Sequence, residues 1–336
     1  MQSKQRILLG HGSGGRLTHD LIRTAILSKF GNPILDKLTD SAVLPYREKL
    51  AFTTDSFVVT PWKFPGGDIG KLAVCGTIND LAVQGARPEY LSVGLIIEEG
   101  LPYAVFNTII DSMAQAARKS NVAIATGDIK VVEKGACDTI FINTSGVGRL
   151  VTRRDLSAQR IKPGDAIILT GTIAEHGLAV LASRRGLDLD LGITSDCQAL
   201  DSLLVPLAGK IGGIKFMRDP TRGGLATTLH EIAESAGLGI IVEERKIPIT
   251  SKVRAACELF GIEALFVANE GKAVLVADKG VSGTIVRNLR RHPFGRHAAV
   301  IGTITSGAKN HVILHTSVGT QRLIDMMDAE PLPRIC

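Results

Sequence analysis

Two consecutive stretches, "KLAFTTDSFVV" at 49–59 and "DIGKLAVCGTINDLAVQGA" at 68–86, indicate how the first half of the chain folds. The first is short and rich in β-branched and aromatic residues, which predicts a strand with Asp55 in its middle. The second has apolar residues at helical spacing, which predicts an amphipathic helix. The same patterns predict a strand, a helix and two further strands at 89–99, 103–121, 122–133 and 138–150. This alternation indicates an α/β unit whose helices pack against a sheet.

The second half of the chain repeats the alternation from residue 166 to residue 305. A polar, turn-rich segment near 153–164 separates the halves and is the expected domain boundary. Past Gly319 the pattern weakens into a short stretch expected to be helical, and then into an extended end. We therefore predict an α/β (α+β) fold with two related α/β domains. The predicted divisions are 1–155, 156–318 and a flexible, extended C-terminal tail at 319–336.

The composition is typical of a well-packed protein that binds neither nucleic acid nor a membrane. Hydrophobic residues make up 45% of the 336 residues, and the net charge is +6. No basic run with interleaved aromatic residues occurs, and no apolar run reaches the ~18–20 residues of a membrane span. The five cysteines are odd in number and form no C-x-x-C pair. This argues against disulfides and zinc and favours a reducing, cytoplasmic location.

Five aspartates occur beside small or hydroxylated residues within otherwise apolar sequence. A carboxylate near a protein core is costly unless it is paired or binds a cation. Taken singly, each is better explained as a turn aspartate or a helix cap. As a set they suggest a Mg²⁺ site, because Mg²⁺ prefers oxygen ligands and bridges to nucleotide phosphates. The five are Asp40, Asp55, Asp80, Asp128 and Asp219.

Two glycine-rich motifs are candidates for binding phosphate groups. "GHGSGG" at 10–15 matches the dinucleotide pattern G-x-G-x-x-G, but too few residues precede it to form the required strand. A glycine loop that closes over a phosphate fits better, and a flexible terminus is the alternative. "RDPTRGG" at 218–224 opens a predicted helix, whose first backbone N–H groups can bind an anion. The candidate residues are Gly12, Gly14 and Gly15 in the first motif and Asp219, Arg222, Gly223 and Gly224 in the second.

Further charged residues lie in "GDIKVVEKG" and "NEGK". Lys130 and Lys134 are an even number of residues apart, so on a strand both would point to the same face. Glu270 and Lys272 are expected in a turn that follows an apolar run. For each of them a solvated loop charge is an equally good explanation.

The chain ends in "PLPRIC", with Cys336 as its last residue. Pro331 and Pro333 exclude a helix and keep this segment extended. From residue 328 to the end, the chain could span up to ~30 Å at ~3.3–3.6 Å per residue. Such a tail is long enough to move between two sites. A reactive thiol on a tether and a frayed terminus with an incidental cysteine are the two explanations.

The chain resembles the HypE hydrogenase maturation proteins, which are carbamoyl dehydratases, over essentially its whole length. The similar motifs are "HGSGG", "TDSFVV", "TINDLAVQGA", "TGDIKVVEKG", "RDPTRGGLATTLHEIAE", "NEGK" and the terminal "PRIC". The family belongs to an ATP-binding superfamily with aminoimidazole ribonucleotide synthetase, selenophosphate synthetase and thiamine monophosphate kinase. The terminal cysteine distinguishes the dehydratases from these relatives. Ile129 stands where the family usually has threonine.

The resemblance implies a PurM-like build for both domains, a homodimer formed through the first-half sheet, and a lyase that uses ATP and Mg²⁺. In this family the carbamoyltransferase HypF places a carbamoyl group on the terminal cysteine. The group is then dehydrated from a thiocarboxamide to a thiocyanate. The nitrile becomes a cyanide ligand of the iron in [NiFe] hydrogenase through a HypC–HypD scaffold complex.

On this chain the resemblance assigns Cys336 as the carrier of the group, and the five aspartates and the two glycine motifs to Mg–ATP. Lys130 or Lys134 and Glu270 are candidates for charge stabilisation and proton removal, with the choice of lysine and of base left open. One alternative is a small-molecule kinase or synthetase of the same superfamily, which would not need Cys336. Another is a non-catalytic adaptor whose terminal cysteine binds iron or carries a group between partners.

Overall fold

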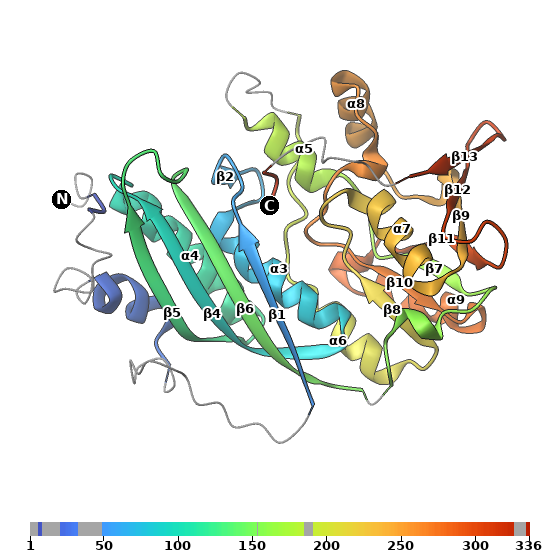
Figure 1. Cartoon of the computed structure of the whole chain (residues 1–336), viewed down its shortest axis with the longest axis horizontal. Coiled ribbons are helices and arrows are strands. Elements are labelled where there is room, and N and C mark those ends of the chain that lie inside the picture. Colours follow the sequence, from blue (N-terminus) through green and yellow to red (C-terminus); the bar gives the residue numbers. More distant parts are fainter. Residues whose placement is uncertain (1–5, 9–20, 33–48, 153, 185–190, 326–333) are drawn as a thin grey trace.

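The structure, a computed structural model, shows two α/β domains that lie side by side, each with helices packed against a sheet (Figure 1). This arrangement confirms the predicted fold class. The C-terminus lies between the two domains (Figure 1). The residues that the structure describes are 6–8, 21–32, 49–152, 154–184, 191–325 and 334–336.

The first domain is built on a four-stranded sheet in the order β1-β6-β4-β5. Its strands are β1 (Leu50–Phe57), β4 (Ala86–Glu98), β5 (Ala123–Val132) and β6 (Ile140–Leu150). β6 pairs antiparallel with β1 and β4, whereas β5 pairs parallel with β4 through the crossover helix α4 (Tyr103–Lys119). The shorter elements are η3 (Ile22–Leu27), α2 (Ser28–Phe30), β2 (Lys63–Phe64) and β3 (Gly67–Asp68).

The helix α3 (Ile69–Val83) lies between the two domains. It begins at Asp68, whose carboxylate accepts hydrogen bonds from two backbone N–H groups of the first turn. The sequence predicted an amphipathic helix, but every residue of α3 except Lys71 and Asp80 is buried. The reason is that one side packs on β1 and β6 while the other packs on the second domain, including α6 (Asp201–Lys210).

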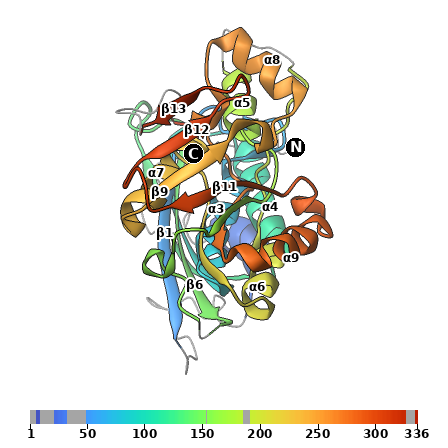
Figure 2. The same cartoon turned by 90° about the vertical axis from the view of Figure 1, so that its right-hand side faces the viewer.

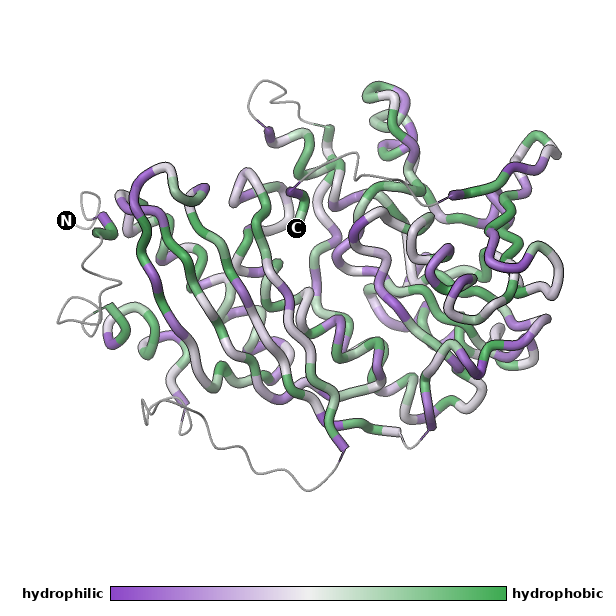
Figure 3. Tube along the Cα trace, viewed as in Figure 1, coloured by the Kyte–Doolittle hydropathy of each residue, from purple (hydrophilic) through white to green (hydrophobic). Residues whose placement is uncertain are grey.

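The face of the four-stranded sheet opposite α3 and α4 carries no helix in the described part of the chain (Figure 1). We call it the open face. Phe52 on β1 and Ile96 on β4 are 71% and 44% exposed there. Hydrophobic stretches along these strands are interrupted by hydrophilic ones (Figure 3). An uncovered sheet face with large exposed apolar side chains is a candidate protein interface.

The second domain is built on a seven-stranded sheet in the order β13-β12-β9-β11-β7-β10-β8. Figure 2 looks onto this domain, where β13, β12, β9 and β11 follow one another. Its strands are β7 (Ala166–Leu169), β8 (Ile214–Arg218), β9 (Gly239–Glu243), β10 (Val274–Ala277), β11 (Ala299–Thr305), β12 (Val312–His315) and β13 (Gln321–Ile324). Besides α6, its helices are α5 (Glu175–Ala182), α7 (Gly224–Ala236), α8 (Ser251–Phe260) and α9 (Lys279–Arg290). Single 3₁₀ turns occur at η5 (Ala158–Arg160), η6 (Glu244–Lys246), η7 (Ala264–Phe266) and η8 (Pro293–Gly295).

The region after Gly319 differs from the sequence prediction. The stretch expected to be helical contains β13, which pairs antiparallel with β12 at the edge of the sheet. Both strands are only four residues long, too short for a periodicity to reveal them, and pairing decides their conformation. The sheet of the second domain therefore continues to Ile324, past the predicted division at residue 318. Residues 326–333 lie outside the described part of the chain.

One hydrophobic cluster runs through both domains and includes Phe106 of α4, Leu229 of α7 and, from the last residues of the chain, Ile335. Ile335 is buried, so the end of the chain is packed into the core that the domains share. Among the described residues, no helix combines the length and the hydrophobicity needed to cross a membrane.

Candidate active site between the two domains

Three of the predicted aspartates come together from three different elements. Asp55 lies on β1, Asp80 on α3, and Asp219 directly after β8. The Thr53 hydroxyl donates a hydrogen bond of 2.8 Å to Asp80 Oδ2, which fixes α3 against β1. Gly76, one turn before Asp80, allows this approach, because a Cβ atom there would lie 2.9 Å from the Phe57 ring. We call Asp55, Asp80 and Asp219 the acidic cluster.

The acidic cluster has raised pKa values because its charges are partly buried and close to one another. Burial raises the pKa of Asp219 to about 7, and the negative charges of Asp80 and Asp55 add to this effect. Burial is also the main cause of the raised pKa values of Asp80 and Asp55. For Asp80 the charge of Asp55 adds to the increase, while the hydrogen bond from Thr53 opposes it. A cation placed among these carboxylates would therefore be attracted strongly.

Glu270 lies beside the acidic cluster in the irregular segment before β10. Its side chain is buried, and burial raises its pKa well above the usual range, with Asp219 and Asp196 as the next causes. Its backbone is held on both sides: its carbonyl accepts from Asn79 Nδ2 at 3.1 Å, and its N–H donates to Asp196 Oδ1 at 3.1 Å. The alternative of a solvated loop charge is therefore wrong for Glu270. A buried carboxyl group whose pKa is raised is a candidate for proton exchange in a reaction.

The helix α7 begins at the acidic cluster. Gly223, just before the helix, and its first residue Gly224 have φ values of +69° and +61°. A Cβ atom on Gly224 would lie 2.6 Å from the backbone carbonyl oxygens of Leu265 and Val267, so only glycine fits there. Next to this turn, a guanidinium nitrogen of Arg222 lies 3.6 Å from Asp55 Oδ1. The Gly224 N–H donates to the Thr221 carbonyl at 2.9 Å, and the N–H groups that follow it at the helix start, together with an arginine, form a suitable environment for a phosphate.

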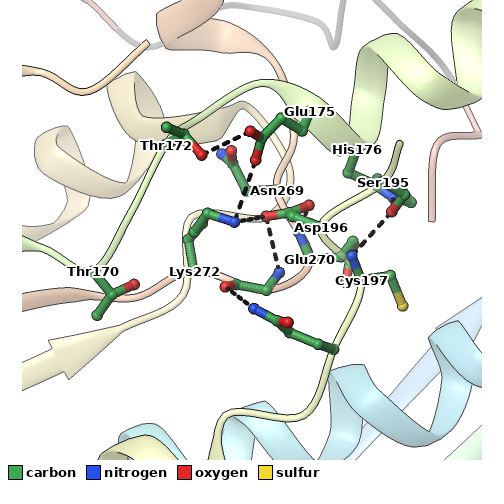
Figure 4. Close-up of polar contacts among 12 residues, drawn as sticks. Thr170, Thr172, Glu175, His176, Ser195, Asp196, Cys197, Asn269, Glu270 and Lys272 are labelled. Carbon is green, nitrogen blue, oxygen red and sulfur yellow. Dashed lines mark hydrogen bonds and ion pairs between the residues drawn. The ribbon is translucent and has the colours of Figure 1, made fainter. Parts of the chain in front are cut away.

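A buried ion-pair network supports Glu270 from the side of the second domain (Figure 4). The Lys272 ammonium lies between Asp196 Oδ2 at 3.0 Å and Glu175 Oε2 at 3.4 Å. Burial would raise the pKa of Asp196, but Lys272 and the N–H donors outweigh it and the pKa is lowered. Because Asp196 also accepts from the backbone N–H groups of Glu270 and Gly271, the network fixes the segment that carries Glu270. Lys272, too, is buried rather than solvated.

The last three residues of the chain are seated against the segment that follows β1. The Val58 N–H donates to the Cys336 carbonyl at 3.1 Å, and the Thr60 N–H donates to the Arg334 carbonyl at 3.3 Å. Val58 directly follows β1, the strand that carries Asp55, so the chain end is hydrogen-bonded to the same segment of the first domain as that aspartate. The end of the tail is therefore docked on the segment that continues the Asp55 strand.

The residues present fit a hard, oxygen-loving cation, although their oxygens do not converge on one point. Among the described residues, no group of three or more His, Cys, Asp and Glu side chains is arranged to hold a metal ion. Mg²⁺ does not need such a cage, because it keeps several waters and takes one or two carboxylates together with phosphate oxygens. Asp55, Asp80 and Asp219 carry negative charges that repel one another, and such an ion would neutralise them.

Comparison with protein families shows that each domain matches a known one. Residues 38–150 match "AIR synthase related protein, N-terminal domain", and residues 162–315 match "AIR synthase related protein, C-terminal domain". The chain is 44% identical over 335 residues to the carbamoyl dehydratase HypE of Rhodobacter capsulatus, covering 99% of this chain and 98% of that protein. It is also 44% identical over 336 residues to HypE of Escherichia coli K12, covering 98% and 99%.

The chain belongs to the HypE carbamoyl dehydratase family. It is thus an enzyme of the hydrogenase maturation class, as its motifs predicted.

Solved structures of HypE proteins have the same fold. A HypE protein in complex with ATP superposes with a TM-score of 0.95 at 44% identity, covering 98% of this chain and 99% of that one. The structure of a HypE–HypF complex matches with a TM-score of 0.80 at 43% identity, covering 91% and 99%. A thiamine monophosphate kinase from Aquifex aeolicus, at 18% identity and a TM-score of 0.60, shares the fold.

Among the described residues, the predicted site residues of β5 and of the turn after it do not join the acidic cluster within one chain. Asp128 and Lys130 lie on β5, the sheet edge opposite β1, where their side chains are exposed and paired at 3.3 Å. Two strands separate β5 from β1, a distance of about 14 Å at ~4.8 Å per strand. Lys134 lies in the turn after β5, so the expectation that it shares a strand face with Lys130 is wrong. Asp40, Gly12, Gly14 and Gly15 lie outside the described residues.

Sequence reasoning missed several residues beside this candidate site, namely Glu175, His176, Ser195 and Asp196. Asp196 occurs in the stretch "ITSDCQAL", which has no helical or strand periodicity, and nothing in the spacing links it to Lys272. His176 opens the apolar run "HGLAVLA", and a histidine on the buried side of a helix was the one available signal.

Proposed function

We propose that this enzyme binds Mg–ATP at the acidic cluster and dehydrates a carbamoyl group carried on the sulfur of its own Cys336. The seating of the chain end against the segment that follows β1 carries the proposal. It holds the chain end on the segment that continues the Asp55 strand, so the thiol is delivered to the same side of the molecule as that carboxylate. The relatives named carbamoyl dehydratase, and the HypE structure in complex with ATP, support the same reaction here.

The reaction turns S–CO–NH₂ into S–C≡N, so one oxygen and two protons must leave. Mg-bound ATP supplies a phosphoryl group to the carbamoyl oxygen, which makes that oxygen a leaving group and yields ADP and phosphate. Asp55, Asp80 and Asp219 would hold the metal ion, and Asp219 would lose its raised pKa once the ion is present. Arg222 and the first N–H groups of α7 would hold the phosphate chain.

Glu270 is the candidate acceptor for the N–H protons. It is buried, it lies at the domain boundary, and its backbone is fixed by Asn79 and Asp196. Burial is the main cause of its raised pKa, and the negative charges of Asp219 and Asp196 add to it; a metal ion in the acidic cluster would offset part of the charge effect and favour the ionised form that acts as a base.

The product and partners follow from the family. We infer that the carbamoyl group comes from HypF, in line with the known HypE–HypF complex. We infer also that the nitrile passes to a HypC–HypD complex as a cyanide ligand for the iron of [NiFe] hydrogenase. A terminal thiol that must carry the group fits the reducing cytoplasm, and none of the five cysteines forms a disulfide.

Asp128, Lys130 and Lys134 would reach a reaction centre only through a second copy of the chain. Asp128 pairs with Gly94, and Gly94 with Asn143, so these positions share the open face with Ser56. Asp55 instead points to the opposite face of the sheet, which α3 covers. A homodimer formed through the open faces would bring the β5 residues of one copy toward the other, and we include this dimer in the proposal.

The deciding measurement is the mass of the C-terminal peptide after incubation with the carbamoylating partner and ATP. The wild-type peptide should gain a carbamoyl group and then lose one water. The C-terminal peptide of Cys336→Ser should form no thiocyanate, because it lacks the sulfur. The affinity of this variant for ATP should change by less than about twofold, because the thiol is not a ligand of the nucleotide. Normal hydrogenase maturation with Cys336→Ser would contradict the proposal.

Glu270→Gln separates proton removal from the earlier steps. The variant should accept the carbamoyl group at the normal rate but dehydrate it about 10² to 10⁴ times more slowly. Quenched-flow sampling with peptide mass analysis measures both rates in one experiment. Equal loss of carbamoylation and dehydration would show that Glu270 has only a structural role.

A further inference from the structure

The tail end is held by side chains that the proposed chemistry does not use. Arg334 donates from Nε to the Val58 carbonyl at 3.0 Å and from a terminal nitrogen to Asp138 Oδ2 at 2.6 Å, and its guanidinium lies over the Phe141 ring. Its φ of +56° is in the left-handed region that L-residues rarely adopt. A residue remains in such a conformation only when its surroundings fix it. The end of the chain is therefore built to occupy this seat.

A directional hydrogen-bond chain reaches the tail from the second domain. His176 Nε2 lies 3.0 Å from the Ile335 carbonyl oxygen, and Nδ1 lies 2.8 Å from the Ser195 hydroxyl. A carbonyl can only accept, so Nε2 carries the hydrogen and donates it. Burial lowers the pKa of His176 and keeps the ring neutral, so Nδ1 accepts from the Ser195 hydroxyl. Ser195 Oγ in turn accepts from the Cys197 N–H at 3.0 Å.

The same short segment connects the tail to the proposed base. Ser195 and Asp196 are neighbours, and Asp196 holds the backbone N–H of Glu270. One segment therefore orients both the histidine that contacts the tail and the residue proposed to remove protons. His176 itself is fully buried, with Phe64 of β2 packed against its ring at 5.3 Å between centroids.

We propose that His176, with its tautomer set by Ser195, is a positioning residue that binds the carbonyl of Ile335 and so holds Cys336 at the reaction site in register with Glu270. This inference rests on the proposed function for its catalytic meaning. The docking that it describes can be measured without any catalysis.

The test compares docking of the tail in wild type, His176→Phe and His176→Gln. Purified full-length protein without ATP or a carbamoyl group is treated with N-ethylmaleimide, and modification of Cys336 is followed by the mass of the C-terminal peptide. His176→Phe keeps a flat ring but loses the donor, so labelling should accelerate about 5- to 10-fold, the effect of one lost hydrogen bond. His176→Gln keeps an N–H donor and should restore the rate to within about twofold of wild type.

A matched control is His315→Phe, which removes a histidine of β12 that pairs with Glu243 away from the tail. Its labelling rate should equal that of wild type. If His176→Phe does not fold, Ser195→Ala replaces it, because losing the hydroxyl donor frees the tautomer and should accelerate labelling about two- to fivefold. Wild-type labelling rates in whichever of these two variants folds would overturn the inference.

Single-turnover dehydration provides the second readout. His176→Phe should slow the loss of water from carbamoylated Cys336 by the same factor as it accelerates labelling, with the KM for ATP unchanged. A change in the KM for ATP alone would overturn the positioning role. If His176→Phe labels faster but the wild-type protein never dehydrates its carbamoylated tail, the role of His176 in docking the tail stands and the proposed function is overturned instead.

Discussion

The carboxyl group of Asp219 has a pKa of about 7 because it is buried beside Asp80 and Asp55. The unfolded chain would release this proton near pH 3.8, so the folded state binds it more tightly. The resulting contribution to stability is fully present below that pH and is lost as the pH rises through about 7. The site thus carries a cost in the absence of a cation, and a cation removes it.

Asp219→Asn removes this cost and makes it measurable. In the metal-free protein at pH 8, we expect the variant to gain about 1–2 kcal/mol, or roughly 2–8 °C in melting temperature. Between pH 4 and pH 7 its melting temperature should fall less than that of wild type. Adding Mg²⁺ and ATP should stabilise wild type more than the variant. Differential scanning calorimetry across pH tests this, and an unchanged pH profile would show that Asp219 is not the group responsible.

At the residue scale, the sequence revealed the type of chemistry better than the arrangement. Asp55, Asp80 and Asp219 were singled out because a carboxylate in apolar sequence needs a partner, and the structure brings these three together. Asp196 could not be found this way, because its partner Lys272 is far along the chain and only folding joins them. The sequence motifs identified candidate residues, but only their positions in the folded structure show which of them form one site.

At the scale of elements, the start of α7 limits what can be changed. Gly224 and Gly237 lie at the two ends of this helix, with φ values of +61° and +64°. They differ in their surroundings, because a Cβ atom on Gly224 would meet two carbonyl oxygens and one on Gly237 would meet nothing within 4 Å. The pair therefore separates backbone strain from close approach.

Gly237→Ala should cost about 1 kcal/mol of unfolding free energy, from left-handed backbone strain alone. Gly224→Ala adds a clash with Leu265 and Val267 and should cost about 3–5 kcal/mol. It should also weaken ATP binding, because the first N–H groups of α7 would be displaced. Urea unfolding and nucleotide titration measure the two effects. Equal costs for both variants would mean that the close approach at Gly224 is relieved by movement of the η7 segment.

Periodicity predicted the elements that alternate regularly and failed where tertiary contacts decide. The helix predicted at 68–86 is present, but the prediction that it is amphipathic was wrong, because α3 is covered on both sides. The edge strand β13 was expected to be helical, since four residues hold no readable period and pairing with β12 sets their conformation. Lys134 does not lie on the strand that carries Lys130, because β5 ends at Val132.

At the scale of the whole molecule, the site exists only because the two domains are fixed against each other. Asn79 of α3 is buried at the boundary, where it donates to the carbonyls of Gln198 and Glu270 and accepts from the Leu200 N–H. Asp55 and Asp80 come from the first domain, Asp219 and Glu270 from the second, and the seated Cys336 from the end of the chain. Sequence spacing carries no information about which residues meet at such a junction, which explains why two domains sharing a site were expected and the contacts of Asn79 between them were not.

The open face is where the molecule as a whole should meet a second copy. Phe52, 71% exposed on β1, pairs across the sheet with Val147, which in turn pairs with Tyr90, so these side chains form one row on this face. Phe52→Asp would place a charge at this row. It should weaken dimerisation by about 2–4 kcal/mol, or roughly 30- to 1000-fold in Kd.

Sedimentation equilibrium of wild type and Phe52→Asp measures the change directly. Leu259→Asp on α8, another highly exposed apolar residue at 64%, is the matched control and should leave the association constant unchanged. Because Asp128 and Lys130 share the open face, the monomeric variant should dock its tail normally and lose any contribution that these β5 residues make to dehydration. A wild-type protein that is monomeric at micromolar concentration, with full activity, would remove both the dimer and any role of β5 from the mechanism.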